Sequence, residues 1–425
     1  KMRRSRSSFY PHLKLPVSSV FLFFSALSLE MVSALFLPSS LSSHYVALQS
    51  FNEKIDSKGS NGDNKCMVLD PFARSKKRRS FLQTPLLAPA FVSVAVGATD
   101  SPADGIEATQ PSLVSSSNWK EGFLQVYRRG TTYKMFYKIF DPEFLYSKTS
   151  PPIITIHGGP SLPSDYVLPL ADALSLTAFN NKENRSIVFF DQIGCGLSDS
   201  PKDKDKDYSI EFLLSDLQTL IENLNLSHYH IYGHSFGGML AYEYVRRGLF
   251  EKDAGLHKDT AKKCQSLVLS SAPISTRETY EELTRIEKEL LKQDPNPFTL
   301  DERLRKTCLC RTPKQPKPLD RAYKKAGKVW YGLDVVMDFE CMRLPLAAGN
   351  QDNGQRMIMP NALILRGEYD FVSQDVLKRW TEEGRFFHKD SKLRTRVFEN
   401  CSHHVLLENG EEYGTAINSF LKEND

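Results

Sequence analysis

The sequence predicts an α/β fold in which a mostly parallel sheet is covered by helices on both faces. Short apolar runs bounded by Gly-rich turns recur along residues 119–425, as in PIITIHGG and ALILRGEYD. Helical patterns at residues 209–224 and 239–247 lie between such runs. Of the 425 residues, 40% are hydrophobic and 25% are charged, which is ordinary for a globular chain with a large core. This alternation favours parallel pairing, because each crossover helix covers one face of the sheet.

Eight runs are expected to form the sheet. GFLQVYRR and YKMFYKIF carry the alternating aromatic residues of a strand pair. The other six read as buried strands: PIITIHGG, SIVFFDQIG, HYHIYGHS, SLVLSSAP, ALILRGEYD and RTRVFEN. Residues 99–273 and 359–425 are therefore assigned to the core of the fold. Residues 274–358 are charged and helical without a clear strand, and we expect a helical cap inserted over the C-terminal edge of the sheet.

Residues 1–98 are predicted to be a targeting presequence. The basic start KMRRSRSSFY precedes an apolar stretch at residues 17–29, which is shorter than the ~20 residues of a membrane span, so a cleaved signal is favoured over an anchor. Arg78 and Arg79 begin a segment similar to a twin-arginine export signal, and processing is expected after Ala98. VSALFLP, at residues 32–38, resembles the junction of bipartite plastid presequences. This resemblance implies a mature chain without a stable membrane span, delivered to a plastid and its thylakoid lumen. The secretory pathway is the alternative.

The net charge of +4 is concentrated in the presequence. Residues 1–98 hold 13 Lys and Arg against 5 Asp and Glu, which leaves 42 against 46 in residues 99–425. The body shows no basic stripe, so no nucleic-acid partner is expected. The seven cysteines are odd in number and scattered, which indicates mostly free thiols, with a disulfide at Cys308 as the alternative. No metal or organic cofactor is expected.

A nucleophile is predicted at Ser235. The segment HIYGHSFGGMLAYEYV contains Gly-x-Ser-x-Gly between a predicted strand and a predicted helix. A sharp turn there brings the serine hydroxyl to the edge of the sheet, and the glycines relieve crowding around it. The N-terminus of the following helix points at the oxyanion that develops during attack.

A serine hydroxyl needs a base that is oriented by a carboxylate. Asp370 follows the strand of ALILRGEYD and can reach the same edge as Ser235, while Asp375 is a weaker rival. The histidine is expected after the next strand, in ENCSHHVLLENGEEY. Composition and periodicity do not distinguish His403 from His404.

Over residues 120–425 the chain resembles the proline iminopeptidases (prolyl aminopeptidases) of the α/β-hydrolase superfamily. The motifs in order are HGGP, FFDQIGCGLSDSP, GHSFGG, GEYDFVS and CSHHVLLENGEEY. In the family's last motif an acid follows the catalytic histidine by five positions. Glu408 stands five positions after His403 and four after His404, so the resemblance implies that His403 is the base.

The resemblance also implies an oxyanion hole formed by the backbone N–H groups of Gly159 and Phe236. The family has a further glycine where this chain has Ser161, so the loop is expected to be stiffer or differently shaped.

The resemblance further implies that cap carboxylates bind the substrate's α-ammonium group. Glu278, Asp338 and Glu340 are the candidates for this clamp, and Asp352 is a further one.

These observations predict a serine aminopeptidase that releases an N-terminal residue, preferably proline, from small peptides with a free N-terminus. An esterase or amidase of the same fold is the alternative, because fold alone does not choose between them. A non-catalytic scaffold is a third reading, although such proteins commonly lose part of the triad and this chain keeps all of it. Epoxide hydrolases and dehalogenases are disfavoured because their nucleophile is an aspartate.

Overall fold

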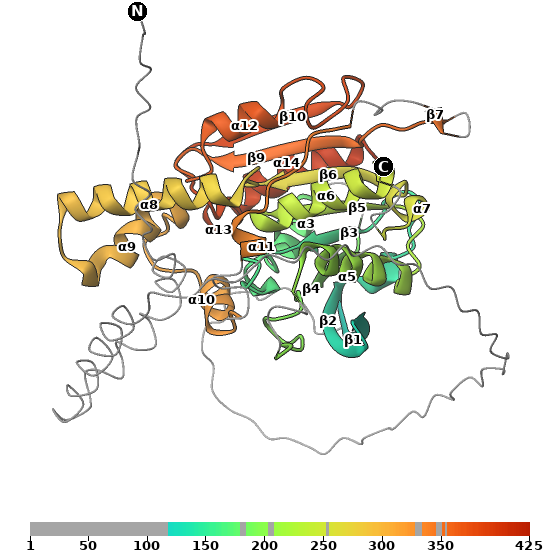
Figure 1. The fold of residues 1–425 in the computed structure, drawn as a ribbon, viewed down its shortest axis with the longest axis horizontal. Coiled ribbons are helices and arrows are strands. Elements are labelled where there is room, and N and C mark those ends of the chain that lie inside the picture. Colours follow the sequence, from blue (N-terminus) through green and yellow to red (C-terminus); the bar gives the residue numbers. More distant parts are fainter. Residues whose placement is uncertain are drawn as a thin grey trace, which may run out of the picture. The chain divides into compact units, whose positions relative to one another are not determined.

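An eight-stranded sheet forms the centre of the fold, in the order β1-β2-β4-β3-β5-β6-β9-β10 (Figure 1). The computed structural model describes residues 118–178, 184–202, 208–251, 255–327, 334–345, 351–352 and 355–425. The strands of the sheet are β1 (Trp119–Arg128), β2 (Thr131–Phe140), β3 (Ile153–Ile156), β4 (Ile187–Phe190), β5 (Tyr229–His234), β6 (Cys264–Ser270), β9 (Asn361–Gly367) and β10 (Leu393–Phe398). The β1–β2 and β2–β4 pairs are antiparallel and the others are parallel. The predicted α/β fold and its eight strands are confirmed.

Helices cover both faces of this sheet. On one face lie α5 (Ile210–Asn223), α6 (Phe236–Phe250), α7 (Lys258–Ala261) and α12 (Gln374–Trp380); on the other lie α3 (Leu170–Ala178), α13 (Val405–Glu408) and α14 (Gly410–Lys422). Consecutive strand residues point to opposite faces, so Ile231 of β5 joins the first core cluster and Tyr232 joins the second. Both faces are buried, which is why the parallel strands read as continuous apolar runs.

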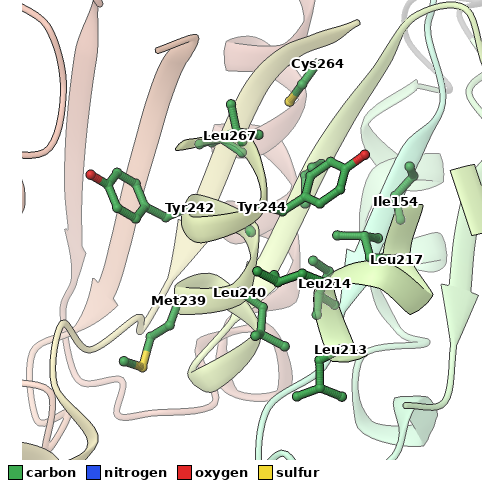
Figure 2. Close-up of a cluster of buried hydrophobic side chains, with 14 of the residues drawn as sticks. Ile154, Leu213, Leu214, Leu217, Met239, Leu240, Tyr242, Tyr244, Cys264 and Leu267 are labelled. Atoms are coloured by element: carbon green, nitrogen blue, oxygen red, sulfur yellow. The ribbon is translucent and has the colours of Figure 1, made fainter. Parts of the chain in front are cut away.

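Figure 2 shows part of the first core cluster, where α5 and α6 pack against the sheet. The helices contribute Leu213, Leu214, Leu217, Met239, Leu240, Tyr242 and Tyr244, and the strands contribute Ile154, Cys264 and Leu267. The apolar residues of α5 recur at helical spacing, and the Ser209 hydroxyl caps that helix by accepting a hydrogen bond from the Phe212 N–H at 3.2 Å. This packing fixes the start of α6, where Ser235 stands.

Between β6 and β9 the chain leaves the sheet and forms a cap. Its helices are α8 (Thr276–Gln293), α9 (Leu300–Leu304), α10 (Lys317–Lys324) and α11 (Asp334–Met337), with shorter turns at η4 (Pro297–Thr299) and η5 (Arg305–Leu309). Ser275 caps α8 by accepting a hydrogen bond from the Glu278 N–H at 3.3 Å. The cap also contains two paired strands of two residues each, β7 (Gln351–Asp352) and β8 (Gln355–Arg356), which were not foreseen because such short strands show no alternation.

Several predictions concern residues beyond the described part. All of the described residues belong to one compact unit. The presequence predictions for residues 1–98 lie outside the described residues, as does Cys66. The other six cysteines are buried free thiols, as expected. None of the helices in the described ranges has the length and hydrophobicity of a membrane span.

Candidate active site

Ser235 occupies the turn between β5 and α6 with a strained backbone. Its φ of 55° and ψ of −125° are unusual for a residue with a side chain. A hydrogen bond of 2.8 Å from the Ser235 N–H to the carbonyl oxygen of Ser270 holds the turn against β6. A strand-to-helix turn of this kind exposes the serine hydroxyl at the edge of the sheet. Ser235 therefore lies where the nucleophile is predicted.

Gly233 and Gly237 leave space that a side chain would fill. A Cβ atom at Gly233 would lie 2.4 Å from the carbonyl oxygen of Gly237. A Cβ atom at Gly237 would lie 2.1 Å from the carbonyl oxygen of Ile156, at the end of β3. Both neighbours are backbone atoms that cannot swing away. The two glycines are required because β3, β5 and α6 approach each other closely beneath Ser235.

His403 and Asp370 are joined by a hydrogen bond. The Nδ1 atom of His403 lies 2.9 Å from Oδ1 of Asp370, and both side chains are buried. The same carboxylate oxygen accepts a 2.9 Å bond from the Val372 N–H, which fixes its position after β9. The neutral imidazole therefore carries its proton on Nδ1 and keeps a lone pair on Nε2. The rival Asp375 is exposed and pairs with Lys378 at 3.0 Å.

The structure separates the two adjacent histidines. The His404 ring stacks on His234, with centroids 5.1 Å apart and an interplanar angle of 16°. The edge of Tyr166 packs against its other side at 5.1 Å. Within the described residues, only His403 of the pair contacts Asp370. Sequence patterns could not decide this, because it depends on how the loop after β10 turns.

Ser235 lines two neighbouring cavities under the cap. The larger, of about 160 Å³, is also lined by both His403 and His404. Its other side chains are mostly apolar, and they include Leu162, Leu283, Leu309, Tyr323, Ala326 and Phe371. The smaller, of about 70 Å³, is lined by Gly159, Phe236, Pro273, Thr276, Thr279, Tyr280, Leu283, Val336 and Met337. Ser235 and His403 thus face partly open, largely apolar space.

The predicted oxyanion residues flank the serine. Gly159 has a φ of +116°, and a Cβ there would lie 2.2 Å from the backbone nitrogen of Ser161. Phe236 is the first residue of α6, where backbone N–H groups have no partner within the helix. Gly159 lines both cavities and Phe236 the smaller one. The Ser161 carbonyl oxygen accepts a hydrogen bond from the Gly327 N–H at 2.9 Å, so the cap holds this loop from above.

The histidines around Ser235 are kept neutral by burial. Burial, together with the nearby His403, lowers the pKa of His234 to about 3. Burial also lowers the pKa of His404 well below its usual value, with smaller contributions from His234 and His403. A charge on either ring would lack solvation. Neither competes with His403 for a proton near neutral pH.

The cap carboxylates predicted to bind the substrate amine lie elsewhere. Glu278 pairs with Arg379, and Asp338 pairs with Arg277. Glu340 is exposed and lies 3.9 Å from the same Arg379. None of the three is among the described residues that line the two cavities at Ser235. The prediction rested on an approximate match in the cap, and the structure does not bring these carboxylates to the serine.

Tyr166, Thr279 and Leu283 were missed by sequence reasoning although they line the cavities. Tyr166 ends a short turn, η3 (Ser164–Tyr166), and no local pattern marks it as part of a site. Thr279 and Leu283 are four residues apart on α8, and this spacing on an amphipathic helix could have marked one inward face. The side chain of Asp352 lies outside the described part of the structure. No group of three potential metal ligands gathers among the described residues.

A family profile described as the alpha/beta hydrolase fold matches residues 151–410. The chain belongs to this family. It is 27% identical to a proline iminopeptidase of Saccharolobus solfataricus over 72% of this chain and 93% of that protein. It is 26% identical to a proline iminopeptidase of Lactobacillus helveticus over 69% of this chain and 96% of that protein. The predicted resemblance and the expectation of an enzyme of the serine-hydrolase class are confirmed.

Solved structures agree on the fold. A proline iminopeptidase of Mycobacterium smegmatis superposes with a TM-score of 0.52 at 17% identity, covering 71% of this chain and 98% of that one. VinJ superposes with a TM-score of 0.52 at 20% identity, covering 72% of this chain and 99% of that one. At these identities the likeness concerns the fold alone.

Proposed function

We propose that this chain is a serine aminopeptidase that releases an N-terminal residue, preferably proline, from small peptides. The observation that carries the proposal is the buried hydrogen bond between His403 and Asp370 beside the cavity that Ser235 also lines. The names of the curated relatives favour the substrate class. Ser235 acts as the nucleophile, His403 as the base, and Asp370 holds the imidazole in the useful tautomer.

The reaction follows from the geometry in two halves. The Ser235 hydroxyl attacks the substrate carbonyl while Nε2 of His403 takes its proton, and the Gly159 and Phe236 N–H groups stabilise the oxyanion. His403 then gives the proton to the leaving amine as the C–N bond breaks. Water, deprotonated by His403, attacks the acyl-enzyme. The C–O bond to Ser235 then breaks, His403 returns the proton to the serine oxygen, and the amino acid is released. Asp370 remains ionised and stabilises the imidazolium formed in each half.

The two cavities suggest which part of the substrate lies where. His403 must protonate the leaving atom, so the leaving group belongs in the larger cavity, which His403 lines. The acyl residue then belongs in the smaller one, beside Phe236. That space is bounded by Pro273, Tyr280, Val336 and Met337, and it suits a compact apolar side chain such as a proline ring.

A free N-terminus needs a partner for its ammonium group beside the acyl cavity. Among the described residues that line this cavity, none is Glu278, Asp338 or Glu340. Glu278→Gln should therefore leave kcat/KM for prolyl-4-nitroanilide unchanged. A loss of tenfold or more would show that Glu278 leaves Arg379 and binds the substrate amine.

An esterase or amidase that ignores the amine is the second candidate. It is favoured by the pairing of Glu278 and Asp338 with arginines away from the cavities. A panel of prolyl-4-nitroanilide, its N-acetyl derivative and 4-nitrophenyl acetate separates the two. The aminopeptidase predicts turnover of the prolyl anilide that acetylation abolishes. Ester hydrolysis without turnover of the free prolyl anilide would establish the esterase instead.

We also propose that residues 1–98 deliver the enzyme to a plastid. The proposal is supported by the order of a signal-like stretch, a polar spacer and Arg78-Arg79 before a second apolar run. A fluorescent protein fused behind residues 1–98 should accumulate in plastids. Accumulation in the medium or in secretory compartments would favour the alternative.

A further inference from the structure

A chain of three buried hydrogen bonds connects the predicted oxyanion loop to the predicted base. The Gly158 N–H donates to the Tyr166 hydroxyl at 2.7 Å. The same hydroxyl lies 2.9 Å from Nδ1 of His234. Nε2 of His234 lies 2.9 Å from the backbone carbonyl oxygen of His403. His234 immediately precedes Ser235. This series of hydrogen bonds therefore involves the oxyanion loop, the residue next to the predicted nucleophile, and the predicted base.

The direction of every bond in this chain is determined. The His403 carbonyl can only accept, so His234 donates from Nε2 and keeps a lone pair on Nδ1. Tyr166 already accepts from Gly158, and its single proton is therefore directed to that lone pair. Burial raises the pKa of Tyr166 well above its usual value and lowers that of His234 to about 3. Both shifts favour the neutral forms, so the bonds keep these directions near neutral pH.

Tyr166 is itself held firmly by the motif FFDQIGCGLSDSP. Asp191, from DQIGCG, accepts hydrogen bonds from the backbone and hydroxyl of Ser164 at 2.9 and 2.7 Å, at the start of η3. Its other oxygen accepts from the Leu197 N–H at 2.9 Å. On the outer side of η3, Asp165 pairs with Lys325 of the cap at 3.1 Å. The turn that carries Tyr166 is thus fixed from both the core and the cap.

We propose that Tyr166 and His234 are positioning residues that set the oxyanion loop in register with His403. They touch no reacting atom in this scheme and act through Gly158 and through the backbone of His403. A hydrogen bond broken anywhere along the chain removes the direct link between Gly158 and His403, and each is then held by separate contacts, such as Ser161 with Gly327 and His403 with Ser271. The role of the DQIGCG motif is then to hold Tyr166 in place, because Asp191 anchors the turn that carries Tyr166. The inference rests on the proposed serine chemistry.

Tyr166→Phe removes one hydroxyl and breaks the chain at its centre. Hydrolysis of 4-nitrophenyl acetate should show a kcat reduced roughly tenfold or more, since small displacements of catalytic groups cost this much. KM should stay within about twofold, because acylation and deacylation both use the same loop and base. Rates are normalised to active sites titrated with a fluorophosphonate, so that misfolded protein does not count.

Tyr229→Phe is the matched control. Tyr229 lies at the opposite end of β5, is equally buried, and donates its hydroxyl proton to the Thr260 carbonyl at 2.7 Å. It should lose a similar hydrogen bond without any change in kcat per active site. An unchanged kcat for Tyr166→Phe, or an equal fall for Tyr229→Phe, would overturn the proposal.

A double-mutant cycle tests the chain as a unit. His234→Leu can neither accept from Tyr166 nor donate to the His403 carbonyl, so it breaks the link that Tyr166→Phe also breaks. The double variant should therefore be no slower than the slower single variant. Losses that multiply would show two independent effects and overturn the proposal. If the wild-type protein neither hydrolyses the ester nor reacts with the fluorophosphonate, the proposed serine chemistry fails, and the inference with it.

Discussion

The two walls of the cavity at Ser235 are built in different ways. The core wall is made of buried groups joined by hydrogen bonds, such as His403 with Asp370 and His234 with Tyr166. The cap wall is formed by Thr279 and Leu283 of α8 together with Leu309, Tyr323 and Ala326. Glu278 of α8 and Asp338, close to it, pair with arginines at the surface.

This difference indicates that the core wall determines the chemistry and the cap wall determines which substrates bind. In the core wall, backbone contacts beneath Ser235 leave no freedom, because even a methyl group at Gly237 would collide with Ile156. In the cap wall, exposed ion pairs contribute little, and side chains can change without disturbing the fold. A rigid core can therefore serve many substrates as the cap varies.

The largest effect should come from the core wall. Gly237→Ala places a Cβ atom 2.1 Å from the Ile156 carbonyl oxygen, and the strand or the helix must shift. We expect a loss of about 3 kcal/mol or more in the free energy of unfolding, measured by urea denaturation. Gly410→Ala, at the start of α14, is the control, because nothing lies within 4 Å of its Cβ position. Equal stability of the two variants would contradict the rigid account of the core wall.

The second-largest effect should be a loss of folding stability at acidic pH. The pKa of four buried histidines is lowered, chiefly by burial: His157, His230, His234 and His404. Below pH 6.5 the unfolded chain binds protons that the folded chain refuses, so this stability is complete above pH 6.5 and is lost as the pH falls. Each histidine contributes up to about 1.4 kcal/mol per pH unit.

The melting temperature should therefore fall steeply from pH 6.5 towards pH 4.5. His404→Gln should flatten that slope, whereas His228→Gln, at an exposed position, should not. Identical slopes for His404→Gln and the wild type would show that His404 accepts a proton in the folded state.

The smallest effect should come from the cap wall. The Glu278 and Arg379 side chains are 49% and 27% exposed, and such a pair contributes about 1 kcal/mol at most. Arg379→Ala should change the unfolding free energy by no more than that and leave kcat/KM unchanged. A tenfold loss of activity would mean that this pair orders the site, and the two walls would then not differ as described.

The sequence predicts the strands and the serine turn of the core wall, but it does not predict the contacts of the cap carboxylates. The strands, the turn at Ser235 and the acid after β9 follow from local patterns, because buried strands and Gly-rich turns have few alternatives. The choice of His403 over His404 relied on the spacing of the family's last motif. In the structure, His403 forms the hydrogen bond to Asp370. The partners of Glu278 and Asp338 depend on how α8 lies over the sheet, which no spacing in the sequence encodes. Tyr166 and His234 meet only because η3 folds back over β5, a tertiary contact.

The central claim is that His403 activates Ser235 in the cavity that both residues line. Fluorophosphonate labelling followed by peptide mass spectrometry tests it directly in the wild type, in Ser235→Ala and in His403→Gln. The account predicts one adduct, located on Ser235, that is absent in Ser235→Ala and forms at least roughly a hundredfold more slowly in His403→Gln. An unlabelled wild type, an adduct on another residue, or equally fast labelling of His403→Gln would contradict it.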